Sequence, residues 1–374
     1  MMDETKNILE RNFSYIDKDN LIVDLEKISL HIEKALSLGE KYSNSIFTDI
    51  AIIDTYRNIR NIIFLGMGGS AIGGNLMSDY LSDEISVPIE VIRGYNLPKY
   101  ANKESLIFAI SYSGNTEETL STLKKSLSVN ANIIALSSGG KFEIFAKQND
   151  FPIIKLPFGI QPRAALPYLF FPVLKILEKI GLIAKKNHET DETLNVLQKI
   201  SKEYSAKSPF KDNMAKRIAF SLYRFLPLIY GTEGLLSAVA MRWKTQINEN
   251  SKWPCFWNAY AELNHNEIVG YEIDNSINKM VKIVYLEDKS GLLRMKQRAE
   301  ITKNLIEDKV AEYITCFSSG KEKLTRMFSL IYLGDMVSYY LAILNGINPT
   351  PVHYIENLKK ELSKKIKFKP NDEN

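Results

Sequence analysis

The sequence predicts an α/β protein of two three-layer αβα domains, each built on a mainly parallel sheet. Three observations predict this architecture. The chain has 374 residues, which is too long for one ordinary domain and enough for two. Short β-branched runs alternate with helical stretches, a rhythm typical of a parallel sheet covered by helices on both faces. That rhythm stops in a polar, lysine-rich segment from Lys185 to about Lys216, and then starts again.

The first domain is expected to follow an N-terminal helical segment. Residues 1–45 mix leucine and isoleucine with many charges at helical spacing, which indicates one or two amphipathic helices. Strands are then expected at several short apolar runs, with helices between them. The expected strands are Asn61–Phe64, Ile89–Ile92, Ser105–Ile110, Ile133–Leu136 and Pro152–Leu156, and the clearest helices cover Asn75–Leu81 and Glu117–Ser126.

The second domain repeats the pattern. Strands are expected at Pro227–Tyr230, Lys282–Leu286 and Tyr313–Cys316, with a helix around Leu235–Arg242. We therefore divide the chain into four parts. They are an N-terminal helical segment (1–45), a first domain (46–185), a polar helical linker (186–216) and a second domain (217–374).

Composition argues against several classes of function. The net charge of +4 comes from 48 basic and 44 acidic residues, a balance that does not suit nucleic-acid binding. The only two cysteines, Cys255 and Cys316, predict reduced thiols and no disulfide framework. The amino terminus lacks a signal-peptide core, and the apolar stretch Ala165–Ile183 is interrupted by charges that do not suit a bilayer. We expect a cytoplasmic protein without membrane or nucleic-acid partners.

A glycine-rich segment from Gly66 to Gly73 lies between the first expected strand and its helix. Glycines allow the backbone to turn close to an anion, and a helix amino terminus presents free N–H groups to it. Gly66, Gly68 and Ala71 also fit the dinucleotide fingerprint G-x-G-x-x-A, but the acidic residue that holds the ribose is missing after the second strand. A phosphate loop is therefore favoured over a nicotinamide site, with a glycine turn needed for packing alone as a second alternative.

Hydroxyl side chains crowd the loop that follows the third strand. Ser111, Ser113 and Thr116 surround a glycine at the start of a helix. Such a nest of neutral donors binds a phosphate monoester without Arg or Lys. Helix capping by Asn115 with Glu118 is the structural alternative, but it leaves the three hydroxyl groups without a role.

The two loops together resemble the sugar-isomerase (SIS) domain. The resemblance rests on Ser-x-Ser-Gly-x-Thr after a strand and on Gly-Gly-Ser-Ala one strand–helix unit earlier. In that family the two loops grip the phosphate of a sugar phosphate. Non-catalytic sugar-phosphate sensors share the motif, so it implies a ligand class and no reaction. The substrate-binding residues that it implies are Gly69, Ser70, Ser111, Ser113 and Thr116.

Two polar clusters in the second half carry a closer resemblance. Gln-Ile-Asn-Glu-Asn-Ser-Lys ends at Lys252, and Glu-Leu-Asn-His-Asn-Glu ends at Glu267. Together with Gln161-Pro162-Arg163 and with Asn-Pro-Thr-Pro-Val from Asn348 onward, they resemble the archaeal-type bifunctional phosphoglucose/phosphomannose isomerases. The resemblance extends from about Asn61 to Lys360.

This resemblance implies a role for four residues. Glu249 is the proton-transferring base, Arg163 faces the enediolate and His265 assists ring opening. A lysine near the carboxyl terminus completes the site. Lys359 is preferred to its neighbour Lys360, because it follows Leu358 as in the family pattern.

The chemistry of aldose–ketose isomerisation calls for these residue types. A proton leaves C2 and returns to C1, so one carboxylate serves as base and then as acid. A fixed guanidinium stabilises the enediolate, and a His, or a Lys at the ring oxygen, moves a proton between O1 and O5 when the ring opens. The scheme needs no metal and no cofactor, and zinc signatures such as H-E-x-x-H are missing from the sequence.

Other candidate residues carry weaker expectations. Thr350 matches a family threonine that leaves room for the C2 epimer. His31 and His188 are expected on the surface, whereas His353 lies near the presumed site.

We therefore expect a metal-independent isomerase that interconverts glucose 6-phosphate or mannose 6-phosphate with fructose 6-phosphate, a step of glycolysis and gluconeogenesis. A single-specificity or aminosugar-phosphate isomerase of the same fold and a non-catalytic sensor are the alternatives, although a sensor needs no base. The aromatic segment Trp253–Trp257 is typical of a subunit interface. As in related isomerases, we expect a homodimer in which His265 enters the partner's active site.

Overall fold

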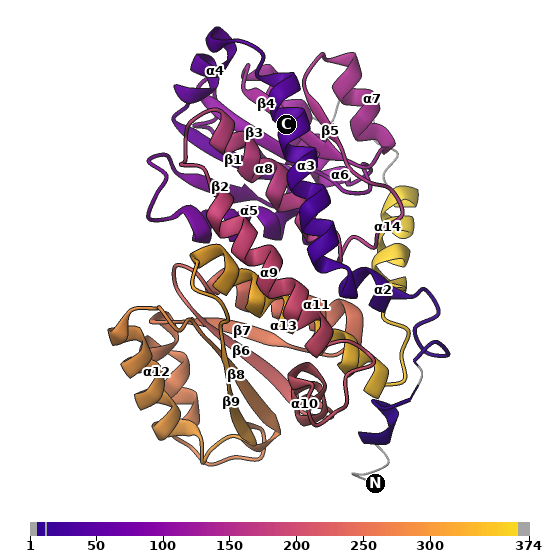
Figure 1. Ribbon diagram of the computed structural model, residues 1–374, viewed down its shortest axis with the longest axis vertical. Coiled ribbons are helices and arrows are strands. Elements are labelled where there is room, and N and C mark those ends of the chain that lie inside the picture. Colours follow the sequence, from indigo (N-terminus) through magenta and orange to yellow (C-terminus); the bar gives the residue numbers. More distant parts are fainter. Residues whose placement is uncertain (1–5, 12, 366–374) are drawn as a thin grey trace.

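The computed structural model, which describes residues 6–11 and 13–365, contains two parallel sheets with helices around them (Figure 1). Both sheets pair all their strands in parallel, which confirms the predicted fold class. The first sheet has the order β2-β1-β3-β4-β5, and the second has the order β7-β6-β8-β9. The strands are β1 (Asn61–Leu65), β2 (Ile89–Ile92), β3 (Ser105–Ile110), β4 (Asn132–Ser137), β5 (Ile153–Lys155), β6 (Leu226–Thr232), β7 (Phe256–Tyr260), β8 (Val281–Glu287) and β9 (Glu312–Phe317).

Helices separate the strands and join the two sheets. In the first half they are α2 (Leu21–Glu26), α3 (Ile28–Ile46), α4 (Ile50–Arg57), α5 (Gly69–Leu81), α6 (Glu117–Ser128), α7 (Gly140–Gln148), α8 (Leu166–Lys179) and α9 (Asn187–Glu203). In the second half they are α10 (Met214–Leu222), α11 (Ser237–Ser251), α12 (Leu293–Ile306), α13 (Lys323–Leu344) and α14 (His353–Lys365), with short 3-10 helices η1 (Glu262–His265), η2 (Glu267–Tyr271) and η3 (Asn278–Met280).

Alternate residues of the first sheet face different helices, as the period of a strand requires. Phe64 and Phe108 lie in the main core with side chains of α5 and α8. Ile63 and Ile107 lie in a second cluster with side chains of α6 and α7. This sheet is therefore the middle layer of an αβα sandwich.

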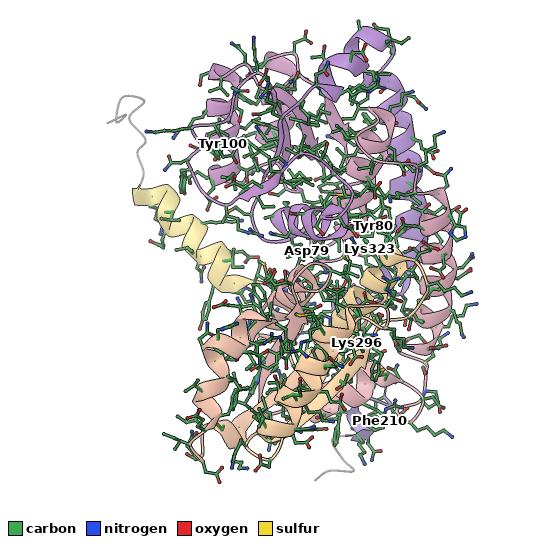
Figure 2. All side chains as sticks on the ribbon, turned by 90° about the vertical axis from the view of Figure 1, so that its left-hand side faces the viewer. Asp79, Tyr80, Tyr100, Phe210, Lys296 and Lys323 are labelled. Carbon is green, nitrogen blue, oxygen red and sulfur yellow. The ribbon has the colours of Figure 1, made fainter. Side chains whose placement is uncertain are left out.

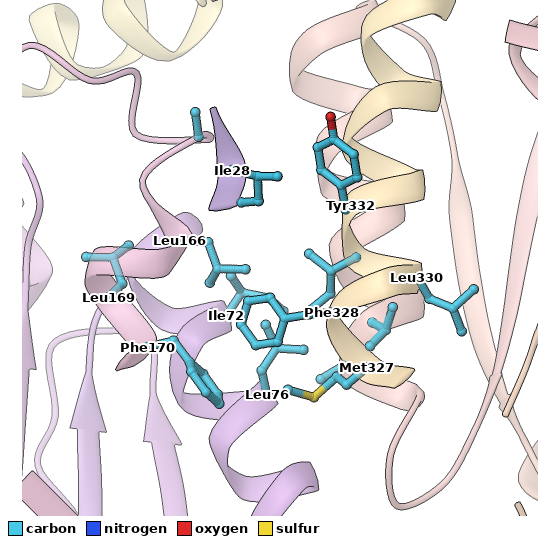
Figure 3. Packing of buried hydrophobic residues seen from close by; sticks show 14 of the residues in the cluster. Ile28, Ile72, Leu76, Leu166, Leu169, Phe170, Met327, Phe328, Leu330 and Tyr332 are labelled. Atoms are coloured by element: carbon cyan, nitrogen blue, oxygen red, sulfur yellow. The ribbon is translucent and has the colours of Figure 1, made fainter. Parts of the chain in front are cut away.

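The two domains share one continuous core. Figure 3 shows Met327 and Phe328 of α13 beside Ile72 and Leu76 of α5, together with Phe170 of α8. By length and composition α13 is the one helix in the described residues that could cross a membrane, but its apolar window is entirely buried. It therefore packs here as the core helix between the two sheets.

Polar contacts also cross the domain boundary. Asp79 of α5 accepts hydrogen bonds from the Ser237 hydroxyl (3.1 Å) and the Ala238 amide (2.8 Å), and so caps the amino terminus of α11. Figure 2 labels Asp79 between the domains, near Tyr80 and Lys323. Burial raises the pKa of Asp79 to about 6, and the two hydrogen bonds oppose this rise.

The N-terminal segment and the expected linker pack on the domains. Helix α3 lies along α8, and α9 packs against both α13 and α3. The proposed domain boundaries stay a prediction. The expectation that His31 lies on the surface was wrong: it is 6% exposed, and its Nδ1 lies 3.1 Å from the Tyr168 hydroxyl. His188 is exposed, as predicted, and pairs with Glu322.

The segment Trp253–Trp257, which we expect at a subunit interface, leads into a strand that the sequence did not predict. Phe256 and Trp257 begin β7, which pairs with β6 as an edge strand. The Trp253 indole donates to the Phe225 carbonyl at 2.6 Å, and Cys255 is buried. An edge strand next to Pro254 was missed because proline interrupts the pattern of alternating residues.

Candidate active site

The two predicted phosphate loops meet at one edge of the first sheet. Strands β2 and β3 lie on opposite sides of β1, so the chain reverses its direction of travel through the sheet between β1 and β3. Ligands of open parallel sheets bind in the crevice at such a switch point, beyond the carboxyl ends of the strands. The loops after β1 and β3 flank this point.

The first loop is shaped by glycine. Gly68 has φ +51° and precedes α5, whose first residue is Gly69. A Cβ atom on Gly69 would lie 3.5 Å from the Pro162 carbonyl oxygen, so this loop lies against the segment that carries Arg163. The amide of Tyr112 donates to the Ser70 hydroxyl at 3.3 Å, which joins the first loop to the second.

The second loop holds its hydroxyl groups together. Ser111 Oγ and Thr116 Oγ1 lie 3.0 Å apart, and Ser113 Oγ accepts from the Asn115 amide at 3.4 Å. Thr116 is the N-cap residue of α6 but makes no capping bond with its side chain. Asn115 Oδ1 instead accepts from the Lys141 amide at 3.2 Å, so the capping box considered from the sequence does not form.

Arg163 and Glu249 form the centre of the site. Arg163 Nη1 lies 3.2 Å from Glu249 Oε2, and their side chains are 7% and 29% exposed. Arg163 Nε donates to Asn250 Oδ1 at 2.7 Å, and Nη2 donates to the carbonyls of Pro349 (3.0 Å) and Thr350 (2.6 Å). The guanidinium is therefore fixed beside the carboxylate by four hydrogen bonds. Within the described residues, Glu249 Oε1 accepts none.

A network of buried hydrogen bonds supports Arg163 and Glu249. Asn250 Nδ2 donates to Ser338 Oγ at 2.9 Å, and Ser338 donates to the Asp335 carbonyl at 2.7 Å. Asp335 accepts from Arg242 and from Gln246, each at 2.8 Å. Arg242 in turn donates to the Arg163 carbonyl at 2.9 Å. Because these buried groups hydrogen-bond to one another, the network fixes Arg163 and the end of α11 in one arrangement, although Arg242 Nε finds no partner among the described residues.

Lys252 joins the same centre, although sequence reasoning gave it no role. Its ammonium donates to the carbonyls of Glu249 (2.6 Å) and Pro349 (2.7 Å), so it ties the end of α11 to the segment that also binds Arg163. Desolvation, with the nearby Arg163 charge, lowers the pKa of Lys252 to about 8. The signal in the sequence was its place as the last residue of the polar cluster around Glu249.

Thr350 lies beside Arg163. Its carbonyl accepts from Arg163, and its hydroxyl oxygen is buried without a hydrogen-bond partner among the described residues. A buried hydroxyl in that state is free to bond a ligand.

The structure of one chain leaves the other predicted residues apart. His265 is exposed in η1, and Lys359 is exposed in α14. Neither is joined to Arg163 or Glu249 by a hydrogen bond or ion pair in the part of the chain that the structure describes. His353 is exposed and pairs with Glu356 at 3.6 Å, so its expected approach to the site is not seen within one chain.

The second sheet has an equivalent switch point between β6 and β8, but different residues flank it. Glu233 follows β6, and Asp288 follows β8. Asp288 accepts from Arg326 Nε at 2.6 Å. Carboxylates repel a phosphate, so of the two switch points in the described residues the one in the first sheet, with its nest of hydroxyl and amide donors, suits a phosphate better.

Two parallel-sheet domains with a hydroxyl-rich nest at the first switch point define an SIS-type protein. The SIS domain model matches residues 55–153, and the model of the bacterial phospho-glucose isomerase C-terminal SIS domain matches residues 211–362. Solved structures share the fold. A hypothetical protein from Thermus thermophilus aligns with TM-score 0.73 and 14% identity over 97% of this chain and 94% of its own. The C-terminal domain of glucosamine-fructose-6-phosphate aminotransferase from Francisella tularensis aligns with TM-score 0.67 and 14% identity, over 88% and 98%.

Relatives of similar sequence show which family of SIS-type proteins the chain belongs to. A bifunctional phosphoglucose/phosphomannose isomerase from Caldicellulosiruptor bescii is 43% identical over 89% of this chain and 96% of its own. Another from Aquifex aeolicus is 35% identical over 82% and 91%. The chain belongs to the family of bifunctional phosphoglucose/phosphomannose isomerases, as the sequence motifs predicted, and it is an isomerase.

Proposed function

We propose that this enzyme interconverts glucose 6-phosphate and mannose 6-phosphate with fructose 6-phosphate through a cis-enediolate, with Glu249 as the base. The ion pair between Arg163 and Glu249, beside the phosphate loops, carries the proposal. A sensor of sugar phosphates would need the loops but not this pair.

The loops and the ion pair give the substrate an orientation. The phosphate would bind Ser70, Ser111, Ser113 and Thr116 at the start of α5 and α6, where amide groups and helix dipoles favour an anion. Gly69 has no side chain to separate the bound phosphate from the Pro162–Arg163 segment. The sugar carbons would then extend toward Arg163 and Glu249.

Glu249 and Arg163 would have different roles in the isomerisation: Glu249 moves the proton, and Arg163 stabilises the negative charge. The open Oε1 of Glu249 would take the C2 proton, while the electrons of the C2–H bond form the C1–C2 double bond of the enediolate. The carbonyl oxygen O1 gains negative charge, which the fixed guanidinium stabilises without losing its own proton. The proton of the O2 hydroxyl then passes to O1, and Glu249 returns its proton to C1, so that C2 becomes the carbonyl carbon of fructose 6-phosphate.

One base can serve both aldoses. Glucose 6-phosphate and mannose 6-phosphate differ only in the configuration at C2, which becomes planar in the enediolate. The two sugars therefore share one intermediate and need only present opposite faces of C2. The buried Thr350 hydroxyl lies beside Arg163, where it would contact this part of the sugar.

A residue of a second subunit would complete the site for ring opening. We propose a homodimer in which His265 enters the partner's site and Lys359 of the C-terminal helix assists at the ring oxygen. The exposure of His265 within one chain favours this arrangement, since a group meant for its own site would lie nearer to Glu249.

Subunit mixing tests the shared site. Inactive Glu249→Gln subunits are mixed with inactive His265→Ala subunits under conditions that allow exchange. Random pairing makes half of the dimers mixed, and each mixed dimer has one intact site, so roughly one quarter of wild-type activity should return. No recovery, with exchange confirmed by a tag, would contradict the shared site.

Coupled assays with each aldose phosphate test the reaction itself. Both sugars should be converted to fructose 6-phosphate, and Glu249→Gln should lower both rates by on the order of 10³-fold. In D2O, fructose 6-phosphate formed from glucose 6-phosphate should gain deuterium at C1, because the base exchanges its proton with solvent. Complete retention of the substrate's hydrogen would favour a hydride shift and overturn the enediolate route.

Glucosamine 6-phosphate belongs in the same assay. A protein named D-glucosamine-6-phosphate 4-epimerase, from Sulfolobus acidocaldarius, is 31% identical over 67% of this chain. Turnover of glucosamine 6-phosphate without turnover of the neutral sugars would establish the aminosugar alternative.

A further inference from the structure

Helix α14 carries an apolar stripe that is exposed in the described part of the chain. Tyr354, Ile355, Leu358 and Leu362 recur at helical spacing on one side, and they are 91%, 42%, 60% and 38% exposed. Every residue from 353 to 362 is exposed. Figure 2 shows α14, in yellow, projecting from the body of the molecule. A helix with four unburied apolar side chains on one side is suited to packing against another surface.

A groove beside η1 and α12 has matching chemistry. It has a volume of 210 Å³ and is lined by Asn264 and Ile268 from the 3-10 helices and by Arg294, Arg298, Ile301 and Leu305 from α12. The four α12 residues lie on one face, at spacings of four, three and four. Ile301 and Leu305 are 58% and 60% exposed, so the groove is apolar at one end and basic at the other.

The two arginines of the groove lack acidic partners. Across residues 6–11 and 13–365, neither Arg294 nor Arg298 forms an ion pair, and Arg298 Nε is buried without a hydrogen-bond partner. Arg298 Nη1 reaches only the Asn264 side-chain oxygen, at 3.3 Å. A buried guanidinium donor without an acceptor is costly, so the groove suits a partner that brings a carboxylate.

Helix α14 brings that carboxylate beside its apolar stripe. Glu361 lies one turn beyond Leu358 and next to Leu362, and Lys359 lies on the other flank of the stripe. Glu361 pairs with Lys364 of the same exposed helix, at 2.6 Å. The combination of four apolar side chains and a flanking glutamate is complementary to Ile268, Ile301 and Leu305 with their two arginines.

We propose that α14 of one copy of this chain docks into the groove between η1 and α12 of a second copy. The proposal rests on the dimer of the proposed function and specifies its contact. Helix α14 begins three residues after Thr350, whose carbonyl binds Arg163. The groove is lined by Asn264, the neighbour of His265. Docking between copies therefore brings His265 of one copy close to Arg163 of the other, with Lys359 between them.

Cross-linking tests this contact without substrate. One chain carries Leu358→Cys and the other Ile301→Cys, and a short bis-maleimide is added after subunit exchange. Cys255 and Cys316 are 2% and 0% exposed, so the native thiols remain unlabelled in the folded protein. A cross-linked dimer is expected from the mixture and not from either chain alone. Replacing Ile301→Cys by Ile144→Cys, at a position 58% exposed on α7, gives the matched control.

Two outcomes overturn the docking. One is the absence of a cross-link in a mixture whose dimers have been shown to exchange subunits. The other is an internal cross-link in the doubly substituted chain at monomer concentrations, which would place α14 in its own groove. Because no turnover is measured, this result is independent of the proposed reaction: an active enzyme without the cross-link refutes the contact alone.

Charge and apolar substitutions give a second measurement. Leu358→Asp and Ile301→Asp should each weaken dimerisation by at least about tenfold in sedimentation equilibrium, whereas Ile144→Asp should not. Glu361→Arg should weaken the dimer, and adding Arg294→Glu to it should restore affinity. Equal dissociation constants for all these variants would refute the contact.

Discussion

Arg163→Lys is the change that tests the candidate site most directly. The guanidinium donates four hydrogen bonds in a fixed plane, to Asn250, Glu249 and the carbonyls of Pro349 and Thr350. A lysine keeps the charge but has one nitrogen, which cannot reach acceptors spread around a planar fork. Loss of one fixed donor to a developing oxyanion costs about 10²–10³ in rate, and we expect kcat/KM to fall by that factor.

The assay must separate this loss from misfolding. Asn250 Oδ1 and the Thr350 carbonyl lose the donor that Arg163 provides, and the Pro349 carbonyl keeps its bond from Lys252, so the melting temperature should fall as well. Affinity for a phosphorylated sugar alcohol, which the phosphate loops bind, should change little. Affinity for a phosphorylated sugar acid, which mimics the enediolate charge, should fall in parallel with kcat/KM. Arg57→Lys is the control, because Arg57 is 55% exposed and forms a surface ion pair with Asp54. A kcat/KM of Arg163→Lys close to that of Arg57→Lys would refute the assigned role.

Three further predictions follow from individual groups. Because the pKa of Asp79 rises from 3.8 to about 6 on folding, its ionisation should lower stability by up to about 3 kcal/mol as the pH rises from 4 to 6. Asp79→Asn, which keeps the acceptor oxygen, should remove this slope in urea unfolding, and an unchanged slope would contradict it. Ser113→Ala and Thr116→Ala should each weaken binding of a phosphorylated inhibitor by about 1–2 kcal/mol in calorimetry; unchanged affinity in both would move the phosphate site. Any decline of kcat at high pH that follows the Lys252 pKa of about 8 should disappear in Lys252→Met. A decline that persists in this variant would be assigned to another group.

The sequence predicted the first sheet nearly completely, for a physical reason. Its strands are short and rich in isoleucine, its central strands β1, β3 and β4 are mostly buried, and β2 and β3 begin and end where the pattern placed them. Both phosphate loops follow from local chemistry, since a glycine turn and a hydroxyl cluster at a helix start need no knowledge of tertiary contacts. Gly114 shows why the pattern is so rigid: it has φ +70°, and a Cβ there would lie 1.7 Å from the Gly139 carbonyl oxygen.

The sequence did not predict the features that depend on packing between distant segments. Helix α13 is buried on all sides, so it has no polar face by which amphipathic periodicity reveals a helix. His31 is flanked by charges in sequence, yet α3 turns it against Tyr168. The role of Lys252 depends on Pro349, which is 97 positions away along the chain. Edge strand β7 is defined by its pairing with β6 and by little in its own composition.

The geometry around Arg163 also indicates which of its bonds changes when substrate binds. The bonds to Asn250 (2.7 Å) and to Thr350 (2.6 Å) are short, and their acceptors are held by the buried network and by the backbone. The bond from Nη1 to Glu249 is the longest of the four, at 3.2 Å, and it alone ends on a partly exposed side chain. A substrate oxygen that displaces the carboxylate from Nη1 therefore leaves the guanidinium in place. In the proposed mechanism, the same displacement separates Glu249 from its counter-ion when the carboxylate has to accept a proton. Binding of the sugar and release of the proposed base from its ion pair would then be one exchange of partners at a single nitrogen.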